Sequence, residues 1–175
     1  FLLRGMPFID LAHLRKRDMQ DGRITYSRHK TDKPITVRIP REALALIAKY
    51  ADRHSASPYL FPILDAGIRD GWLSYRNYQD ALRHFNRKLE QVMSRLLPGV
   101  RVSSYMARHT WATLAFHSGQ PVGIISQALG HSSLRVTETY LKPFGNELVD
   151  KANRQLIASV RKCKWKNETG YRAGL

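Results

Sequence analysis

Residues 103–141, SSYMARHTWATLAFHSGQPVGIISQALGHSSLRVTETYL, decide the fold of this chain because their pattern divides them into short helices joined by turns. The spacing predicts a helix over 103–117, a turn over 118–121 whose proline suits the start of a second helix, and Gly130 as the end of that helix. A third helix is predicted over about 132–142. The apolar positions are Ala107, Trp111, Leu114 and Ala115 in the first helix, and Val122, Ile125 and Leu129 in the second.

The residues that precede this stretch predict one small antiparallel sheet. Two strand-like runs, 23–28 and 34–39, flank the short polar connection 29–33, and in the second run apolar and polar residues alternate as in a half-buried strand. Further helices are predicted over 8–14, after Pro40, over 74–97 and over 146–160. The fold class is therefore mainly α with a small antiparallel β-sheet (α+β).

Composition limits the class of partner. The 175 residues, of which 43% are hydrophobic and 25% charged, suit one globular domain. The net charge of +15 indicates a polyanionic partner, with nucleic acid first and an anionic membrane surface second. No run approaches the roughly 20 apolar residues that a membrane span needs. The single cysteine, Cys163, excludes an internal disulfide, fits a reducing cytosol and leaves no zinc pattern.

The chain opens without a methionine, on an apolar start that Arg4 interrupts and that is too short for a signal peptide. We expect a fragment that lacks its N-terminal part. A catalytic domain is expected over residues 1–161 and a basic C-terminal tail over 162–175.

Three motifs follow one another at fixed spacing. They are Arg108-His109-Thr110 on a helix, Leu129-Gly130-His131-Ser132 in a turn, and Tyr140 nine positions after His131. A tyrosine alone indicates nothing in a chain with eight of them, but this order resembles the signature of the tyrosine recombinases, the phage-integrase type of DNA strand-exchange enzyme. The resemblance extends from about residue 4 to 157 and is specific within 103–141. It implies the catalytic-domain fold of that family.

The resemblance implies a chemistry that suits these residue types. Tyr140 would attack the scissile phosphate and form a 3′-phosphotyrosine link, which splits one hard step into two and conserves the bond energy, so no ATP or other cofactor and no metal is needed. Arg108 matches the second arginine of the family and would bind the phosphate through its planar, permanently charged fork. His131 would hydrogen-bond the same phosphate.

The family also uses a lysine on the β-hairpin as general acid for the leaving 5′-hydroxyl. Lys30, in His29-Lys30-Thr31-Asp32-Lys33, fits the Lys-Thr-Gly pattern found there, with Asp32 at the glycine position. Lys33 is the alternative, and it is also a candidate for DNA contact.

Two positions depart from the family pattern. The arginine motif usually begins with histidine, but here Tyr105 stands at that position, and a tyrosine cannot take up a proton near pH 7 as histidine does. The first arginine usually lies three residues before an acidic residue and a leucine. Aligning on Asp10 puts Pro7 there, so we predict that a backbone detour at Gly5 brings Arg4 to the same phosphate. The Arg4-Gly5-Met6 run is similar to one in integrase-like proteins of Bacteroides-type bacteria.

Double-stranded DNA is the expected partner. Arg76, Arg83, Lys88 and Arg95 lie on the exposed side of the predicted helix over 74–97 and could follow DNA phosphates or form a solvated basic face. Relatives clamp DNA with a further N-terminal domain, so this chain alone is expected to bind weakly and nonspecifically. We expect a monomer in isolation, a homotetramer on DNA, and a bacterial cytoplasmic location with nucleoid association.

Two alternatives stay open. Short helices joined by Gly/Pro turns on a basic chain also fit a non-catalytic helical DNA-binding module. A type IB topoisomerase shares the tyrosine chemistry. The Leu-Gly-His-Ser turn favours the recombinase over the topoisomerase. A recombinase of this kind would carry out DNA integration or recombination for a mobile element.

Overall fold

The computed structural model describes residues 1–141 and 145–169, with side chains up to residue 159. The chain divides into two compact units, Phe1–Leu141 and Lys142–Leu175. The second unit contains one helix, α7 (Asn146–Thr169), which is longer than the predicted helix over 146–160. The predicted border between domain and tail at residue 161 falls inside this continuous helix, and residues 170–175 of the predicted tail lie outside the described part.

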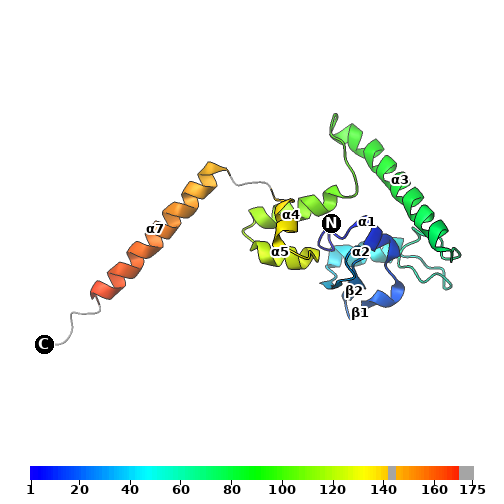
Figure 1. The fold of residues 1–175 in the computed structure, drawn as a ribbon, viewed down its shortest axis with the longest axis horizontal. Helices are drawn as coiled ribbons and strands as arrows, with labels where there is room; N and C mark the ends of the chain where they lie inside the picture. The colour runs from blue at the N-terminus through cyan, green and yellow to red at the C-terminus, as the bar shows by residue number, and fades with distance from the viewer. Residues whose placement is uncertain (142–144, 170–175) are drawn as a thin grey trace. The chain divides into compact units, whose positions relative to one another are not determined.

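The first unit contains six α-helices around one small sheet, and the predicted fold class is confirmed (Figure 1). Among the described residues, no helix combines the length and apolar character needed to cross a lipid bilayer. The elements are α1 (Phe8–His13), a 3-10 turn (Lys16–Asp18), β1 (Met19–Gln20), β2 (Arg23–Ser27), β3 (Pro34–Arg38), α2 (Arg41–Tyr50), α3 (Gly71–Leu96), α4 (Met106–His117), α5 (Val122–Leu129) and α6 (Leu134–Glu138).

The sheet has the order β1-β2-β3 with antiparallel neighbours, as the two predicted strands require. Ile24 pairs with Val37 and Tyr26 pairs with Ile35, so the alternation of both strands places these four side chains on the buried face. The two-residue β1 was not predicted because so short a run shows no alternation.

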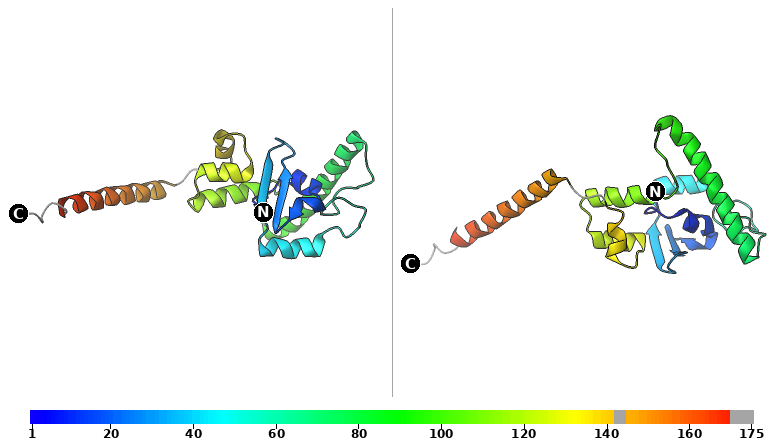
Figure 2. Two further views of the ribbon diagram at one scale, coloured as in Figure 1. Left: turned by 90° about the horizontal axis from the view of Figure 1, so that it is seen from below. Right: turned by 45° about the horizontal axis from the view of Figure 1, so that its top comes forward.

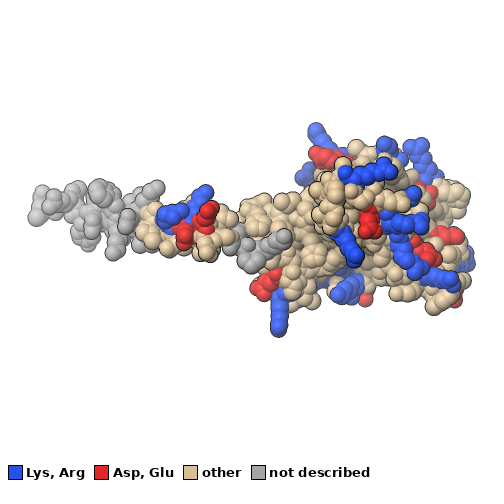
Figure 3. Space-filling view, turned by 90° about the horizontal axis from the view of Figure 1, so that it is seen from above, with Lys and Arg blue, Asp and Glu red and all other residues tan. Residues whose placement is uncertain are grey.

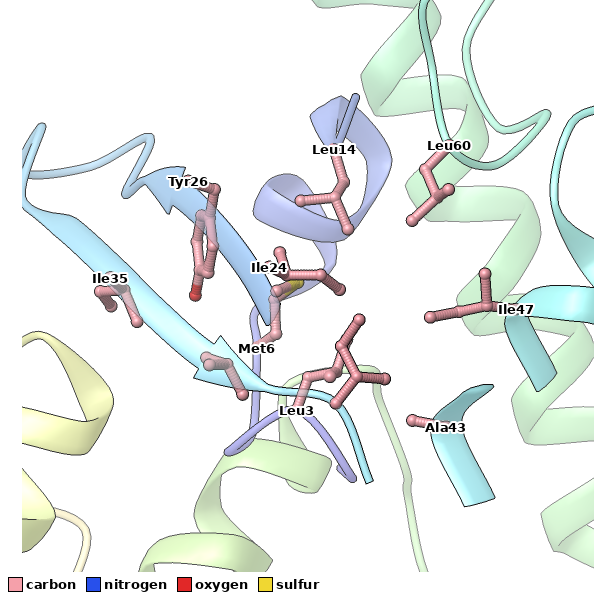
Figure 4. Close-up of a cluster of buried hydrophobic side chains, with 11 residues drawn as sticks. Leu3, Met6, Leu14, Ile24, Tyr26, Ile35, Ala43, Ile47 and Leu60 are labelled. Carbon is pink, nitrogen blue, oxygen red and sulfur yellow. The ribbon is translucent and has the colours of Figure 1, made fainter. Parts of the chain in front are cut away.

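The main core lies between the buried face of the sheet and α2 (Figure 4). Ile24 is fully buried and Leu14 nearly so, and each such side chain stabilises the fold by about 1.5–3 kcal/mol. Ala43 and Ile47 of α2 and Leu3 from the N-terminal loop complete the cluster. This core fixes β2 and β3, and therefore the hairpin between them.

A second core joins α4 to α5 through Ala112, Ile125 and Leu129. Both views of Figure 2 show these two helices beside the sheet. The predicted apolar face of α4 is partly wrong, because Leu114 is 52% exposed while Arg108 is 2% exposed. A hydropathy pattern counts arginine as a surface residue and therefore assigned the face incorrectly.

Helix α3 begins at Gly71, before the predicted start, because the side chain of Asp70 accepts a hydrogen bond from the Leu73 amide at 2.8 Å and caps it. Phe8 of α1 stacks on Phe85 of α3 with ring centroids 4.8 Å apart. This contact attaches α3 to the rest of the unit.

The last helix of the unit is shorter than predicted. We expected a helix over 132–142 that contains Tyr140, but α6 ends at Glu138 and Tyr140 lies in the turn that follows. The Tyr140 amide donates to Thr137 O at 3.0 Å, and its carbonyl accepts from Thr113 Oγ1 at 3.2 Å. A bond to α4, rather than a helical turn, therefore holds Tyr140.

Candidate active site

Three separate elements deliver the side chains of the predicted motifs. Arg108 lies on α4, His131 follows the end of α5, and Tyr140 follows α6. Gly130 turns the chain at this point with φ +66°, and a Cβ there would lie 2.5 Å from Ile35 Cδ1 of β3. A glycine therefore lets the turn carrying His131 press against the sheet.

Arg108 is held on its buried side by backbone carbonyls. Its Nη1 donates to Gly5 O at 3.2 Å and its Nη2 donates to Leu129 O at 2.5 Å. Burial, followed by the positive charge of Arg28, lowers the pKa of Arg108 from its usual value. The guanidinium is thus oriented in advance by groups that cannot neutralise it.

His131 has a defined tautomer. Its Nε2 lies 3.0 Å from Arg108 Nη2, which can only donate, so Nε2 accepts and the remaining proton sits on Nδ1. Nδ1 then donates to Thr137 Oγ1 at 2.9 Å. Burial, and then the charge of Arg108, lowers the pKa of His131 to about 4. The ring is therefore neutral at neutral pH.

Tyr140 is half-buried against the other two groups. Its ring centroid lies 5.0 Å from that of His131 and 6.0 Å from Arg108 Cζ. The ring centroid of His109 lies 4.5 Å from that of Tyr140. The structure thus brings together the three residues that the motifs predicted, and adds His109, which the sequence argument had left aside.

Tyr105 touches the predicted nucleophile directly. Its hydroxyl contacts the hydroxyl of Tyr140. Burial, followed by that hydrogen bond, raises the pKa of Tyr105 to about 12. Tyr105 therefore stays protonated at neutral pH, which suits a hydrogen-bond donor to the oxygen of Tyr140 and not a resting base.

The hairpin lysines reach the same region. Lys33 Nζ donates to His131 O at 3.0 Å, while Lys30 is exposed at the tip. Asp32 has φ +49°, a left-handed conformation that glycine adopts freely and aspartate tolerates. This conformation explains why aspartate can stand at the glycine position of the Lys-Thr-Gly pattern.

A cavity of about 440 Å³ opens between these elements. Its lining includes Arg28, Lys30, Tyr105, His131 and Tyr140. Within the described residues, neither Arg4 nor Arg108 is part of this lining, although Arg108 contacts His131, which is. The predicted nucleophile, Tyr140, therefore lines the same cavity as Arg28, an arginine that was not among the predicted site residues.

Arg4 lies in the loop before α1. Both Arg4 and Gly5 have positive φ, +55° and +62°, so the predicted backbone detour is present. The detour brings the Gly5 carbonyl to Arg108, while the Arg4 side chain is half-buried. Its predicted contact with a phosphate stays a prediction.

Arg28 was missed. It follows β2 at the base of the hairpin, is 7% exposed and pairs with Asp10, with Nε 2.9 Å from Oδ2. A signal was present, because Arg28 continues the alternation of Ile24 and Tyr26 on the buried side of the predicted strand. Extending the two-residue alternation to the last residue of the predicted strand would have predicted a buried Arg28.

The four basic residues predicted on α3 are all exposed, as expected. Arg83 pairs with Asp80, and Arg76 lies over the Trp72 ring with Cζ 5.4 Å from its centroid. Figure 3 shows Lys and Arg side chains scattered over the face of the first unit that it draws. Their contact with DNA stays a prediction.

Residues 3–147 match the phage integrase family. The chain belongs to the phage integrase family. The tyrosine recombinase XerA of Pyrococcus furiosus is 28% identical to it over 153 residues, which are 86% of this chain and 50% of XerA. The chain thus spans about half the length of this relative, as it does for XerA of Thermococcus kodakarensis, where 29% identity covers 79% of this chain and 46% of the relative.

Solved structures agree with membership of the phage integrase family. A crystal structure of XerA recombinase superposes with a TM-score of 0.63 at 20% identity, covering 88% of this chain and 54% of that chain. The XerH recombinase bound to its difH substrate gives a TM-score of 0.60 at 18% identity, covering 87% and 43%. At these identities the comparison shows a shared fold.

Proposed function

We propose that this chain is the catalytic part of a tyrosine-type recombinase or integrase that cleaves and rejoins DNA through a 3′-phosphotyrosine intermediate. The observation that carries the proposal is the mutual contact of Tyr140, Arg108 and His131, which come from three elements separated in sequence. Membership of the phage integrase family supports the same conclusion.

In the proposed cleavage step, Tyr140 Oη forms a bond to the scissile phosphorus while the bond from phosphorus to the 5′-oxygen breaks. Arg108 hydrogen-bonds the phosphate oxygens, where negative charge increases in the transition state. His131 can donate to the same oxygens only after its proton moves from Nδ1 to Nε2. Tyr105, being protonated, donates to the oxygen of Tyr140, whose own proton passes to water. Lys30 gives its proton to the departing 5′-oxygen.

Rejoining is the reverse of this step. A 5′-hydroxyl attacks the phosphotyrosine and gives its proton to Lys30. The bond from phosphorus to Tyr140 Oη breaks as the phosphodiester forms again, and Oη takes a proton from water. Because the phosphotyrosine keeps the energy of the broken bond, the cycle needs neither ATP nor a further cofactor. Exchange of the incoming strand turns cleavage into recombination.

Double-stranded DNA is the proposed substrate, and the net charge of +15 supports it. Two proteins that are similar in fold have solved structures with such ligands, XerH bound to its difH substrate and the Tn1549 integrase in complex with a circular intermediate DNA. A homotetramer on DNA, a monomer without it and a bacterial cytoplasmic location complete the proposal.

The test is to trap and map a covalent adduct. The chain is incubated with a random-sequence pool of nicked duplexes, and DNA that stays attached after denaturation is recovered and sequenced. Mass spectrometry of the peptide should identify Tyr140 as the modified residue, and Tyr140→Phe should give no adduct while nearly retaining DNA affinity. An adduct formed by Tyr140→Phe would contradict the proposal.

The same experiment separates the alternatives. DNA binding without any adduct would favour the non-catalytic DNA-binding module. Relaxation of supercoiled DNA through a Tyr140 adduct, without exchange between two sites, would favour a type IB topoisomerase.

A further inference from the structure

The side chain of Arg28 is fixed in the cavity from two directions. Asp10, which is 4% exposed, pairs with its Nε, and Nη1 donates to Leu129 O at 2.6 Å across 101 positions of sequence. The Arg28 amide donates to Lys33 O at 2.9 Å and so closes the base of the hairpin. An arginine held this firmly has lost its rotamer freedom before any ligand binds.

Arg28 and Arg108 share one acceptor. Arg28 Nη1 and Arg108 Nη2 both donate to the carbonyl oxygen of Leu129, at 2.6 and 2.5 Å. Two guanidinium groups therefore meet at a single neutral oxygen inside the protein. Like charges so close repel each other, and burial weakens the screening that water would provide.

The counter-charge at this place is incomplete. Asp10 balances one guanidinium, and its second oxygen, Oδ1, already accepts from the His29 amide at 2.9 Å. The hairpin adds Lys30 and Lys33, and His131 is neutral. Two of these positive residues, Arg28 and Lys30, line a cavity that Tyr140 also lines, and Arg28 meets Arg108 at the Leu129 carbonyl. An anion is the ligand that relieves this repulsion.

We propose that Arg28 and Arg108 form a two-arginine clamp for the scissile phosphate, so that the residue after β2 supplies the arginine expected before α1. The assignment rests on the proposed function for the identity of the anion. Asp10, the acidic residue of the usual arginine motif, keeps its place but orients an arginine from the hairpin. Pro7 can then stand where the arginine is usual, and Arg4 is not required.

The first test measures binding without chemistry. Inorganic phosphate is titrated into the chain, and the side-chain NMR signals of His131 report occupancy of the cavity. The double variant Arg28→Met with Asp10→Asn removes both charges together, so that net charge is unchanged and no buried carboxylate is left unpaired. We expect its phosphate affinity to fall about 10- to 100-fold, as for loss of charge-assisted hydrogen bonds.

The matched control is Arg23→Met with Asp21→Asn, an exposed pair near the other end of the same hairpin with the same change of charge. Its phosphate affinity should equal that of the wild type. Thermal unfolding monitors the fold of each variant. If the Arg28 double variant folds and binds phosphate as well as the wild type, Arg28 has only a structural role and the clamp is overturned.

The second test measures cleavage on the duplex recovered by adduct selection. The Arg28 double variant should form adduct at least about 100-fold more slowly than the wild type. Arg28→Lys, which keeps the charge and loses the planar fork, is the second variant if the double variant does not fold, and it should also slow cleavage while Arg23→Lys does not. Loss of both activity and phosphate affinity in Arg4→Ala, with neither lost in the Arg28 variants, would assign the role to Arg4 and overturn the clamp.

The experiments can contradict the recombinase assignment and the two-arginine clamp independently of each other. If the wild type binds phosphate through Arg28 but forms no adduct with any duplex, the recombinase assignment fails and the anion clamp stands. If the wild type forms a Tyr140 adduct and the Arg28 variants bind and cleave normally, the clamp fails and the recombinase assignment stands.

Discussion

The buried side of the half-buried strand β2 differs in character from its start to Arg28, the residue that follows the strand. At the start of β2, Ile24 lies in an apolar core with Val37 and Ile47, while two and four residues later the same side carries Tyr26 and Arg28. Burial and the charge of Asp10 raise the pKa of Tyr26 to about 12, so it stays neutral between the two regions. The apolar end gains free energy from burial.

The polar end gains far less from burial, because two desolvated guanidinium groups and a neutral histidine replace apolar side chains. Such groups are stable there only because each has a partner, namely Asp10, the Leu129 carbonyl or Thr137. The difference shows that the start of the strand contributes stability to the domain, while the residues at its end contribute to the proposed chemistry.

The largest expected effect concerns the polar end. Arg108→Gln should lower the rate of adduct formation about 10²- to 10³-fold, because a fixed donor to the transition state is lost. Single-turnover cleavage measures the rate. Arg135→Gln, which changes an exposed arginine of α6, is the control and should cleave normally. Equal rates for the two variants would remove Arg108 from the chemistry.

A substitution at the apolar end should lower the stability of the fold and not the rate of cleavage. Ile24→Ala leaves a cavity in the main core and should lower the free energy of unfolding by about 2–5 kcal/mol. Chemical denaturation measures this loss, and cleavage per folded molecule should stay the same. Thr25→Ala, on the exposed side of the same strand, should cost under about 1 kcal/mol. A similar loss at both positions would contradict the assigned core.

Gly130 lies where the two regions meet. Gly130→Ala should destabilise the domain through its left-handed conformation, by about 1–2 kcal/mol, and by a further 1–3 kcal/mol or so through overpacking against Ile35. Gly119→Ala isolates the second contribution, because Gly119 has φ +81° and no neighbour near its Cβ position. Equal destabilisation of both variants would show that Ile35 moves away freely.

The smallest expected effect is the pH dependence of stability that comes from His131. The pKa of His131 is lowered to about 4 in the folded state, so the unfolded state binds more protons between pH 4 and the usual histidine value. This contribution to stability is therefore full at neutral pH and is lost as pH falls through that window. Thermal unfolding between pH 4 and 7.5 should show a weaker pH dependence in His131→Asn. An unchanged dependence would contradict a neutral, buried His131.

Much of the fold could be predicted from local sequence. The positions of α2, α5 and the two longer strands follow from apolar spacing and from Gly and Pro at the turns, and the structure shifts the strand ends by one residue. Errors occurred where a tertiary contact replaced a local rule. The helix expected to contain Tyr140 ends early and Thr113 holds that residue, and the buried face of α4 includes an arginine.

By itself, the sequence determined the order of the elements and the three motifs with Arg108, His131 and Tyr140, because backbone propensity and motif spacing are local properties. Only the tertiary structure decided that Arg28 joins Arg108 at the Leu129 carbonyl, that His131 is held as a neutral tautomer, and that Tyr105 meets Tyr140. The physical reason is that these contacts join residues far apart in the chain, and the environment of a buried charge depends on everything packed around it.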